Sequence, residues 1–239
     1  MPDSNPKPSI VLVHGAFADA TGWQKIILAL EKKGYAVTAV QIPLKSLADD
    51  VATTVRALQS QKGEVVLVGH SYGGAVISGA GTNANVKALV YVSAFAPDQG
   101  EALGPLIESY PPSALTPAIV PDSAGFLYID RSKFRDVFAA DVSDSESTVM
   151  AATQKPISGA IFGEPSGAAA WKTLPSWYIV AKEDHAINPD LERFFAKRMK
   201  ATTVELASSH VPFISQPNEV IEVIETAVLS LVKRPGSKS

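Results

Sequence analysis

The sequence predicts an α/β protein whose six-stranded, mainly parallel sheet is flanked by helices. Three observations support this fold class. Short apolar runs alternate with segments of helical periodicity, the 239 residues suit one domain with a sizeable core, and a long proline-rich stretch interrupts the alternation after the fourth strand. We therefore expect a single domain over residues 1–239 that contains an insertion at residues 97–175.

The strands and helices follow from the two periodicities. Continuous apolar or β-branched runs predict strands at residues 9–13, 35–40, 64–68, 86–94, 176–181 and 202–207. Apolar side chains at helical spacing predict helices at residues 21–33, 46–61, 73–81, 189–200 and 217–232. Units of this kind form parallel sheets through right-handed crossovers, and their sites lie outside the carboxyl ends of the strands.

The insertion at residues 97–175 is expected to be a folded, helical cap. Long connections without structure of their own are uncommon in compact domains. This one contains nine prolines, several aromatic residues and helix-like stretches near residues 132–140 and 144–154. The aromatic residues favour a packed cap over an extended linker.

Composition excludes several classes of function. A net charge of −3 gives no electrostatic case for nucleic acid or an anionic membrane surface. No apolar run approaches the roughly 18 residues of a membrane span, and the absence of cysteine excludes disulfides and thiol nucleophiles. The polar residues 1–9 do not resemble a signal peptide, so we expect a cytoplasmic protein, and residues 233–239 read as a solvated end.

The third strand is followed by Gly69-His70-Ser71-Tyr72-Gly73 and then by a helix. A G-x-S-x-G sequence between a strand and a helix is typical of a turn so sharp that its neighbours must be small, with the serine hydroxyl projecting above the sheet. The alternative is a glycine turn that only connects the two elements. We interpret Ser71 as a candidate nucleophile.

A serine nucleophile needs a histidine base that a carboxylate holds in place. Of the four histidines, His210 alone follows the serine in a loop directly after the last strand. The acid is expected after the preceding strand, where Asp184 is the better candidate and Glu183 stays open. Solvated loop residues are the ordinary alternative for both positions.

The oxyanion that forms during attack needs two backbone N–H donors. One is expected from Tyr72, directly after the nucleophile, and the other from Ala16 in the loop after the first strand. Phe17 would then line the substrate pocket. The alternative is an ordinary loop that leads into a helix.

Together, "VHGAF", "GHSYGG", "AKEDHAINP" and "SSHVPF" resemble the motifs of the α/β-hydrolase superfamily, in its order and over nearly the whole chain. "VLVHGAFADATGW" and "VYVSAFAPDQGE" resemble the compact group of plant methyl esterases, hydroxynitrile lyases and bacterial esterase-like proteins. The resemblance implies the strand order 2-1-3-4-5-6, a cap over the pocket, and catalysis by Ser71, His210 and Asp184. It also implies that Ala16 and Tyr72 form the oxyanion hole.

This sequence departs from the lyases of the group at two positions. The lyases have threonine where this chain has Ala16 and lysine where it has Val211. We therefore expect a carboxylic ester hydrolase that acts on a small, uncharged, partly apolar ester through an acyl-enzyme. No metal or organic cofactor is expected, and the protein is expected to be a monomer or homodimer. The alternatives are a receptor of the same fold without turnover, a lactonase, a carbon–carbon bond hydrolase or a cofactor-free dioxygenase.

Overall fold

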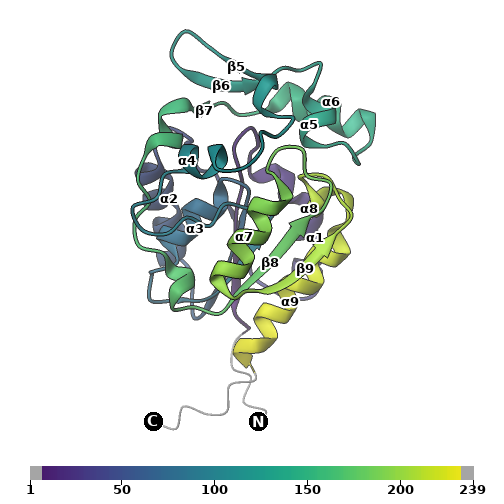
Figure 1. The fold of residues 1–239 in the computed structure, drawn as a ribbon. Helices are drawn as coiled ribbons and strands as arrows, with labels where there is room; N and C mark the ends of the chain where they lie inside the picture. Colours follow the sequence, from purple (N-terminus) through teal and green to yellow (C-terminus); the bar gives the residue numbers. More distant parts are fainter. Residues whose placement is uncertain (1–6, 233–239) are drawn as a thin grey trace, which may run out of the picture.

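The computed structural model describes residues 7–232, and its main sheet has six parallel strands (Figure 1). They are β1 (Ser9–Val13), β2 (Val37–Val40), β3 (Val65–His70), β4 (Val86–Val92), β8 (Ser176–Ala181) and β9 (Thr202–Leu206). Their order, β2-β1-β3-β4-β8-β9, confirms the predicted order 2-1-3-4-5-6. Strands β1 and β3 are buried along their whole length, which explains their continuous apolar sequences.

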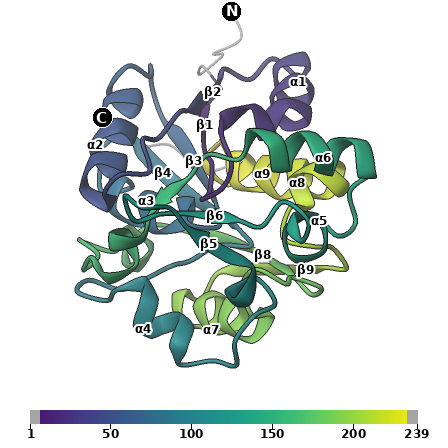
Figure 2. The same cartoon turned by 90° about the horizontal axis from the view of Figure 1, so that it is seen from above.

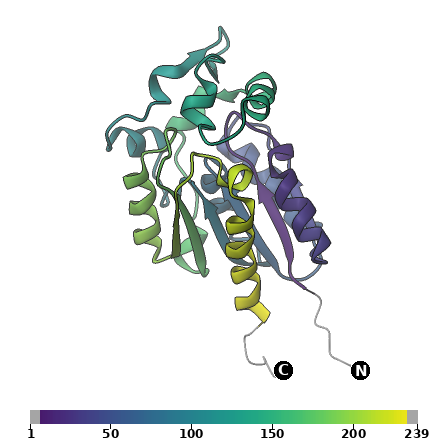
Figure 3. The same cartoon turned by 90° about the vertical axis from the view of Figure 1, so that its right-hand side faces the viewer.

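Helices cover both faces of the main sheet (Figures 2 and 3). Helices α1 and α9 contact each other on one face, whereas α2 and α3 contact each other on the opposite face, where α7 also lies. The main helices are α1 (Gln24–Lys32), α2 (Leu47–Gln59), α3 (Gly73–Ala80), α7 (Pro189–Met199), α8 (Pro212–Ser215) and α9 (Pro217–Val232), with the 3₁₀ turn η1 (Ala20–Trp23) before α1. No helix among residues 7–232 is long and apolar enough to cross a membrane.

Side-chain caps explain where two of these helices begin. The side chain of Ser46 accepts a hydrogen bond from the Asp49 N–H at the start of α2. The side chain of Asn188 caps α7, and Pro189 occupies its first turn. The polar ends predicted at residues 1–6 and 233–239 lie outside the described residues.

Within the insertion (residues 97–175), residues 119–158 lie over the carboxyl ends of the strands (Figures 1 and 3), whereas residues 170–172 contact α3 beside the main sheet. Its helices are α4 (Leu103–Glu108), α5 (Phe134–Phe138) and α6 (Asp144–Thr153), with 3₁₀ turns η2 (Thr116–Ala118), η3 (Gly159–Gly163) and η4 (Ala170–Lys172). It also contains a three-stranded antiparallel sheet that the sequence did not predict, formed by β5 (Ile119–Pro121), β6 (Phe126–Ile129) and β7 (Ile157–Ser158).

The turn between β5 and β6 explains this small sheet. The Asp122 carboxylate accepts hydrogen bonds from the N–H groups of Ala124 and Phe126. Gly125 adopts a φ of 80°, which favours glycine. The turn residues therefore make the hairpin, although each strand is too short to show a periodicity of its own.

Candidate functional site

Ser71 occupies a sharp, strained turn between β3 and α3. Its φ is 53°, in the left-handed region that serine rarely adopts. The Ser71 N–H donates to the Val92 carbonyl at 3.2 Å, and its own carbonyl accepts from Gly74 N at 2.9 Å and Phe95 N at 3.1 Å. Surrounding contacts therefore hold the backbone in a conformation that is costly by itself, as is typical of functional turns.

The glycines of this turn are required by close backbone approaches. A Cβ on Gly69 would lie 2.6 Å from the Gly73 carbonyl oxygen, and one on Gly73 would lie 2.7 Å from the carbonyl oxygens of Val13 and His14. A Cβ on Gly15 would lie 2.7 Å from the Ser71 Cβ. The loop after β1 therefore packs directly against the turn that carries Ser71.

The structure brings Asp184 and His210 together at the ends of β8 and β9. His210 Nδ1 lies 2.5 Å from Asp184 Oδ2, and both residues are buried. Asp184 Oδ1 also accepts the N–H groups of Ala186 at 2.6 Å and Ile187 at 2.9 Å. Because the neighbouring Glu183 is exposed, Asp184 is the partner of His210.

The backbone of His210 is fixed by the residue that precedes Ser71. His70 Nε2 lies 2.9 Å from the His210 carbonyl oxygen and donates to it, and the two imidazole rings are 4.6 Å apart between centroids. Complete burial lowers the pKa of His70 well below its ordinary value, so its ring is neutral. Among residues 7–232, no hydrogen bond joins the Ser71 hydroxyl to His210, a contact that is often loose before substrate binds.

The two predicted oxyanion donors lie in the loop after β1 and in the turn after β3. Ala16 is in the loop that packs against Ser71, and Tyr72 follows Ser71 directly before α3. Within the part of the chain that the structure describes, neither backbone N–H donates to another protein group. Buried N–H groups are nearly always paired, so these two are available to a ligand oxygen.

His14 controls the orientation of the Gly15–Ala16 peptide. His14 Nε2 accepts the Ile42 N–H at 3.2 Å, so the proton is on Nδ1, which donates to the Gly15 carbonyl at 2.8 Å. A trans peptide directs its N–H opposite to its carbonyl, and the Ala16 N–H therefore points away from His14. Burial, partly opposed by the Gly15 hydrogen bond, lowers the pKa of His14 to about 4.

The side chain of Tyr72 connects the elements that surround the site through hydrogen bonds. Its hydroxyl donates to Asp50 Oδ2 at 2.7 Å, and Asp50 Oδ1 accepts the Leu44 N–H at 2.8 Å. Burial raises the pKa of Asp50, although both hydrogen bonds oppose the rise. Tyr72 thus ties α2 and the loop after β2 to the turn that carries Ser71.

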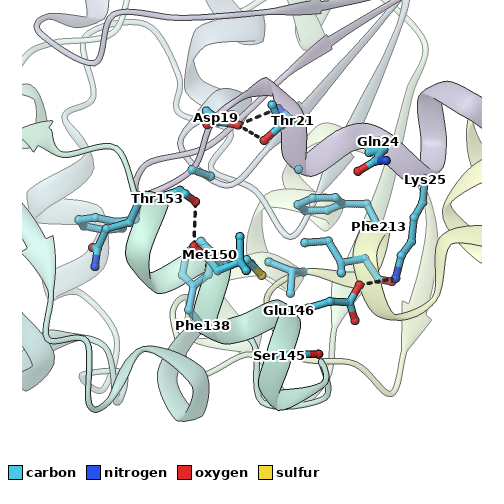
Figure 4. A pocket seen from close by; sticks show the side chains of 17 residues that line it. Asp19, Thr21, Gln24, Lys25, Phe138, Ser145, Glu146, Met150, Thr153 and Phe213 are labelled. Carbon is cyan, nitrogen blue, oxygen red and sulfur yellow. Dashed lines mark hydrogen bonds and ion pairs between the residues drawn. The ribbon is translucent and has the colours of Figure 1, made fainter.

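A cavity of about 420 Å³ opens beside the site, between α6, η1 and α8 (Figure 4). Phe17, as predicted for a pocket residue, lines it together with Phe138, Met150 and Phe213. Ser71 does not line the cavity. The ring of Phe138 lies 6.5 Å from that of Phe17 and 4.9 Å from that of His210, so Phe138 both lines the cavity and packs against His210.

Three residues near the site were not predicted from the sequence. Phe138 and Asp141 come from the insertion, and Asp141 accepts hydrogen bonds from the backbone N–H and hydroxyl of Ser209, next to His210. Glu192 is fully buried on α7. Only Glu192 carries a local signal, because it falls on the helix face that also carries Phe195 and Met199.

No group of three His, Asp or Glu side chains within residues 7–232 is arranged to hold a metal ion.

Comparison with known proteins gives a consistent result. Residues 10–223 match the model of the "Alpha/beta hydrolase family". A probable hydrolase of a Phoma species is 28% identical over 91% of this chain and 97% of its own, and Methylesterase 8 of Arabidopsis thaliana is 26% identical over 88% and 86%. The crystal structure of a pyrethroid hydrolase from Sphingobium faniae superposes with a TM-score of 0.80 at 23% identity, over 95% of this chain and 99% of that one.

Proposed function

We propose that this chain, which belongs to the alpha/beta hydrolase family, is a serine hydrolase that cleaves a small, uncharged, partly apolar carboxylic ester through an acyl-enzyme. The observation that carries the proposal is the buried Asp184–His210 hydrogen bond beside the left-handed Ser71 turn. Relatives named as a methylesterase and a pyrethroid hydrolase support ester chemistry. The cytoplasmic location expected from the sequence stays a prediction.

The proposed reaction starts with attack of the Ser71 hydroxyl oxygen on the ester carbonyl carbon. His210 Nε2 takes the hydroxyl proton, while Asp184 keeps the ring oriented and stabilises it when it is charged. The N–H groups of Ala16 and Tyr72 bind the oxyanion. Collapse of this intermediate breaks the bond to the alcohol oxygen, which receives the proton from His210 and leaves the acyl group on Ser71.

The second half of the reaction repeats these roles with water. His210 removes a proton from water, the resulting hydroxide attacks the acyl carbon, and the Ser71 oxygen leaves with the proton that His210 returns. The carboxylic acid is released and the enzyme is restored. Every proton transfer uses His210.

We assign the cavity beside the site to the apolar part of the ester. Its volume of about 420 Å³ lies in the range of small-molecule pockets, and Phe17, Phe138 and Met150 give it an apolar wall. The insertion supplies α6 on one side of the cavity and so acts as the cap of the site. The Lys25–Glu146 ion pair is about half exposed and contributes little binding energy there.

The test compares wild type with Ser71→Ala on p-nitrophenyl esters of increasing acyl length, recording the initial burst and the steady rate. We expect steady turnover in the wild type and its loss, by at least about 10³-fold, in the variant. A matched control is Ser78→Ala. This variant also removes a buried serine hydroxyl, but one on α3 that forms a hydrogen bond with the Tyr91 hydroxyl. A burst without turnover would favour the alternative of a receptor of the same fold that does not turn over its ligand. Unchanged turnover in Ser71→Ala would contradict the proposal.

A further inference from the structure

Glu192 is a buried carboxyl group that the proposed reaction does not use. It lies on α7 with no exposed surface, and its Oε2 accepts the Ala181 N–H at 3.0 Å. Its Oε1 is also buried, and among the described residues it has no N–H or hydroxyl partner. A carboxylate with one oxygen unpaired and away from water would be strongly destabilising. The state of this group therefore needs a physical explanation.

Glu192 lies against the turn that carries Asp184, because Ala181 donates its N–H to Glu192 and its carbonyl oxygen accepts the Asp184 N–H at 3.3 Å. The buried Asp184 carboxylate is close enough for its charge to act on Glu192. Two ionised carboxylates in contact and away from water repel each other, so such a pair retains one proton. Asp184 accepts three N–H donors, from Ala186, Ile187 and His210. Glu192 accepts only the Ala181 N–H, so the proton belongs on Glu192.

The other ionisable groups around the pair agree with this assignment. The buried Tyr178 of β8 stays neutral, because burial raises its pKa and its hydroxyl donates to the Ala94 carbonyl. The guanidinium of Arg193 binds Glu205 and Asp190 at the surface. Burial first, and then the charge of Asp184, raise the pKa of Glu192 well above its ordinary value.

We propose that Glu192 is a positioning residue of the triad, whose neutral carboxyl group donates through Oε1 to the Asp184 carboxylate while Oε2 accepts the Ala181 N–H. This inference rests on the proposed function, because it takes Asp184 as the partner of His210. The donated hydrogen bond fixes the Asp184 carboxylate in place. It also ties α7 to the end of β8, where the loop that carries Asp184 begins.

Two variants separate hydrogen bonding from packing. Glu192→Gln keeps a donor for Asp184 and an acceptor for Ala181. Glu192→Met introduces a side chain of similar length that has neither this donor nor this acceptor. We expect Glu192→Gln to keep kcat/KM within about threefold of wild type. We expect Glu192→Met to lower kcat by roughly 10-fold or more, because the Asp184–His210 geometry loosens. The exposed neighbour Glu183→Gln is the matched control and should resemble wild type.

The pH profile distinguishes this role from a merely structural one. In Glu192→Met, the Asp184 carboxylate is no longer held in place against His210, so it stabilises protonated His210 less. The acid limb of kcat/KM should then move downward, on the order of half a pH unit, while the Glu192→Gln limb stays in place. An unmoved limb in Glu192→Met, or an equal loss of kcat in both variants, would overturn the positioning role.

The protonation state is tested without activity, by following Tm against pH for wild type and Glu192→Gln. A carboxyl group whose pKa is raised on folding stabilises the protein below its unfolded pKa and loses that contribution as the pH rises towards its folded pKa. The Tm of Glu192→Gln relative to wild type should therefore increase from pH 5 to pH 8. A difference that does not change with pH would overturn the neutral state of Glu192. Because this readout does not involve Ser71, it separates failure of this inference from failure of the proposed function.

Discussion

His14 illustrates how one buried side chain can prepare a reaction site without touching the reacting atoms. Both ring nitrogens form hydrogen bonds: one accepts the Ile42 N–H and the other donates to the Gly15 carbonyl. This arrangement requires the neutral ring, because a protonated ring would turn its only acceptor into a second donor facing the Ile42 N–H. The orientation of the Ala16 N–H therefore depends on the ionisation of His14.

The sign of the resulting pH dependence follows from the lowered pKa. The ordinary value is 6.5 and the folded value is about 4, so the contribution of neutral His14 is complete above pH 6.5 and is lost as the pH falls through about 4. Denaturant unfolding of wild type and His14→Leu should show a stability difference that shrinks by about 3 kcal/mol between pH 7 and pH 4. His185→Leu, which changes an exposed histidine, is the control, and a difference that stays constant with pH would contradict the assignment.

At the residue scale, the candidate site residues predicted from the sequence are those that follow a strand within a recognisable motif. Ser71, Asp184 and His210 each lie a few residues after a strand, so the order of the chain was enough to propose them. Glu192 and Phe138 could not be predicted in this way, because their positions depend on how α7 and the insertion pack. The contact between Asp184 and Glu192 joins residues whose relation is visible only in three dimensions.

At the element scale, the turn between β3 and α3 holds the site together through close backbone contacts. Gly73 begins α3 and lies against the carbonyl groups of Val13 and His14 at the end of β1. Two loops that follow different strands therefore share one contact point. Any change there displaces both predicted oxyanion donors at once.

Gly73→Ala tests this contact. The added Cβ would lie 2.7 Å from two carbonyl oxygens, so the backbone must move, with an expected destabilisation of about 1–3 kcal/mol. Esterase activity should fall far more than stability accounts for, because the Ala16 and Tyr72 N–H groups separate. Gly163→Ala is the matched control, since no atom lies within 4 Å of the added Cβ. Activity similar to wild type in a folded Gly73→Ala protein would show that the contact does not position the donors.

The elements of the main sheet were predictable because each carries its own signal. The strands at residues 9–13 and 176–181 and the helix at residues 217–232 lie where their apolar patterns place them. The helix predicted at residues 21–33 begins instead as the 3₁₀ turn η1, where Asp19 accepts the Thr21 N–H. In the insertion, strands of two to four residues form only because they pair with one another.

At the scale of the whole molecule, the insertion limits the exposure of the site to solvent. Ser71 is only 6% exposed, and Phe138 of α5 packs against the ring of His210. Phe138 and Phe17 both line the cavity, and their rings are in edge-to-face contact. We therefore expect this pair of aromatic residues to determine which acyl groups can reach Ser71.

Phe138→Leu tests this expectation. A smaller side chain should open space between the cavity and His210, so kcat/KM for long acyl groups should rise relative to acetate esters by about 10-fold, the low end of the effect expected for one methylene group. Phe134→Leu is the matched control, because Phe134 is equally buried and its tilted ring packs against Phe138 but does not line the cavity. The same preference in both variants would contradict a selective role for Phe138.

The central claim is that Ser71 carries an acyl group during turnover. The most direct test mixes the protein rapidly with a p-nitrophenyl ester, quenches with acid and locates the added mass by peptide mass spectrometry. We expect one acyl group, found on Ser71, that appears before steady turnover and is absent from Ser71→Ala. Turnover without any acylated peptide, or acylation of another residue that persists in Ser71→Ala, would contradict it.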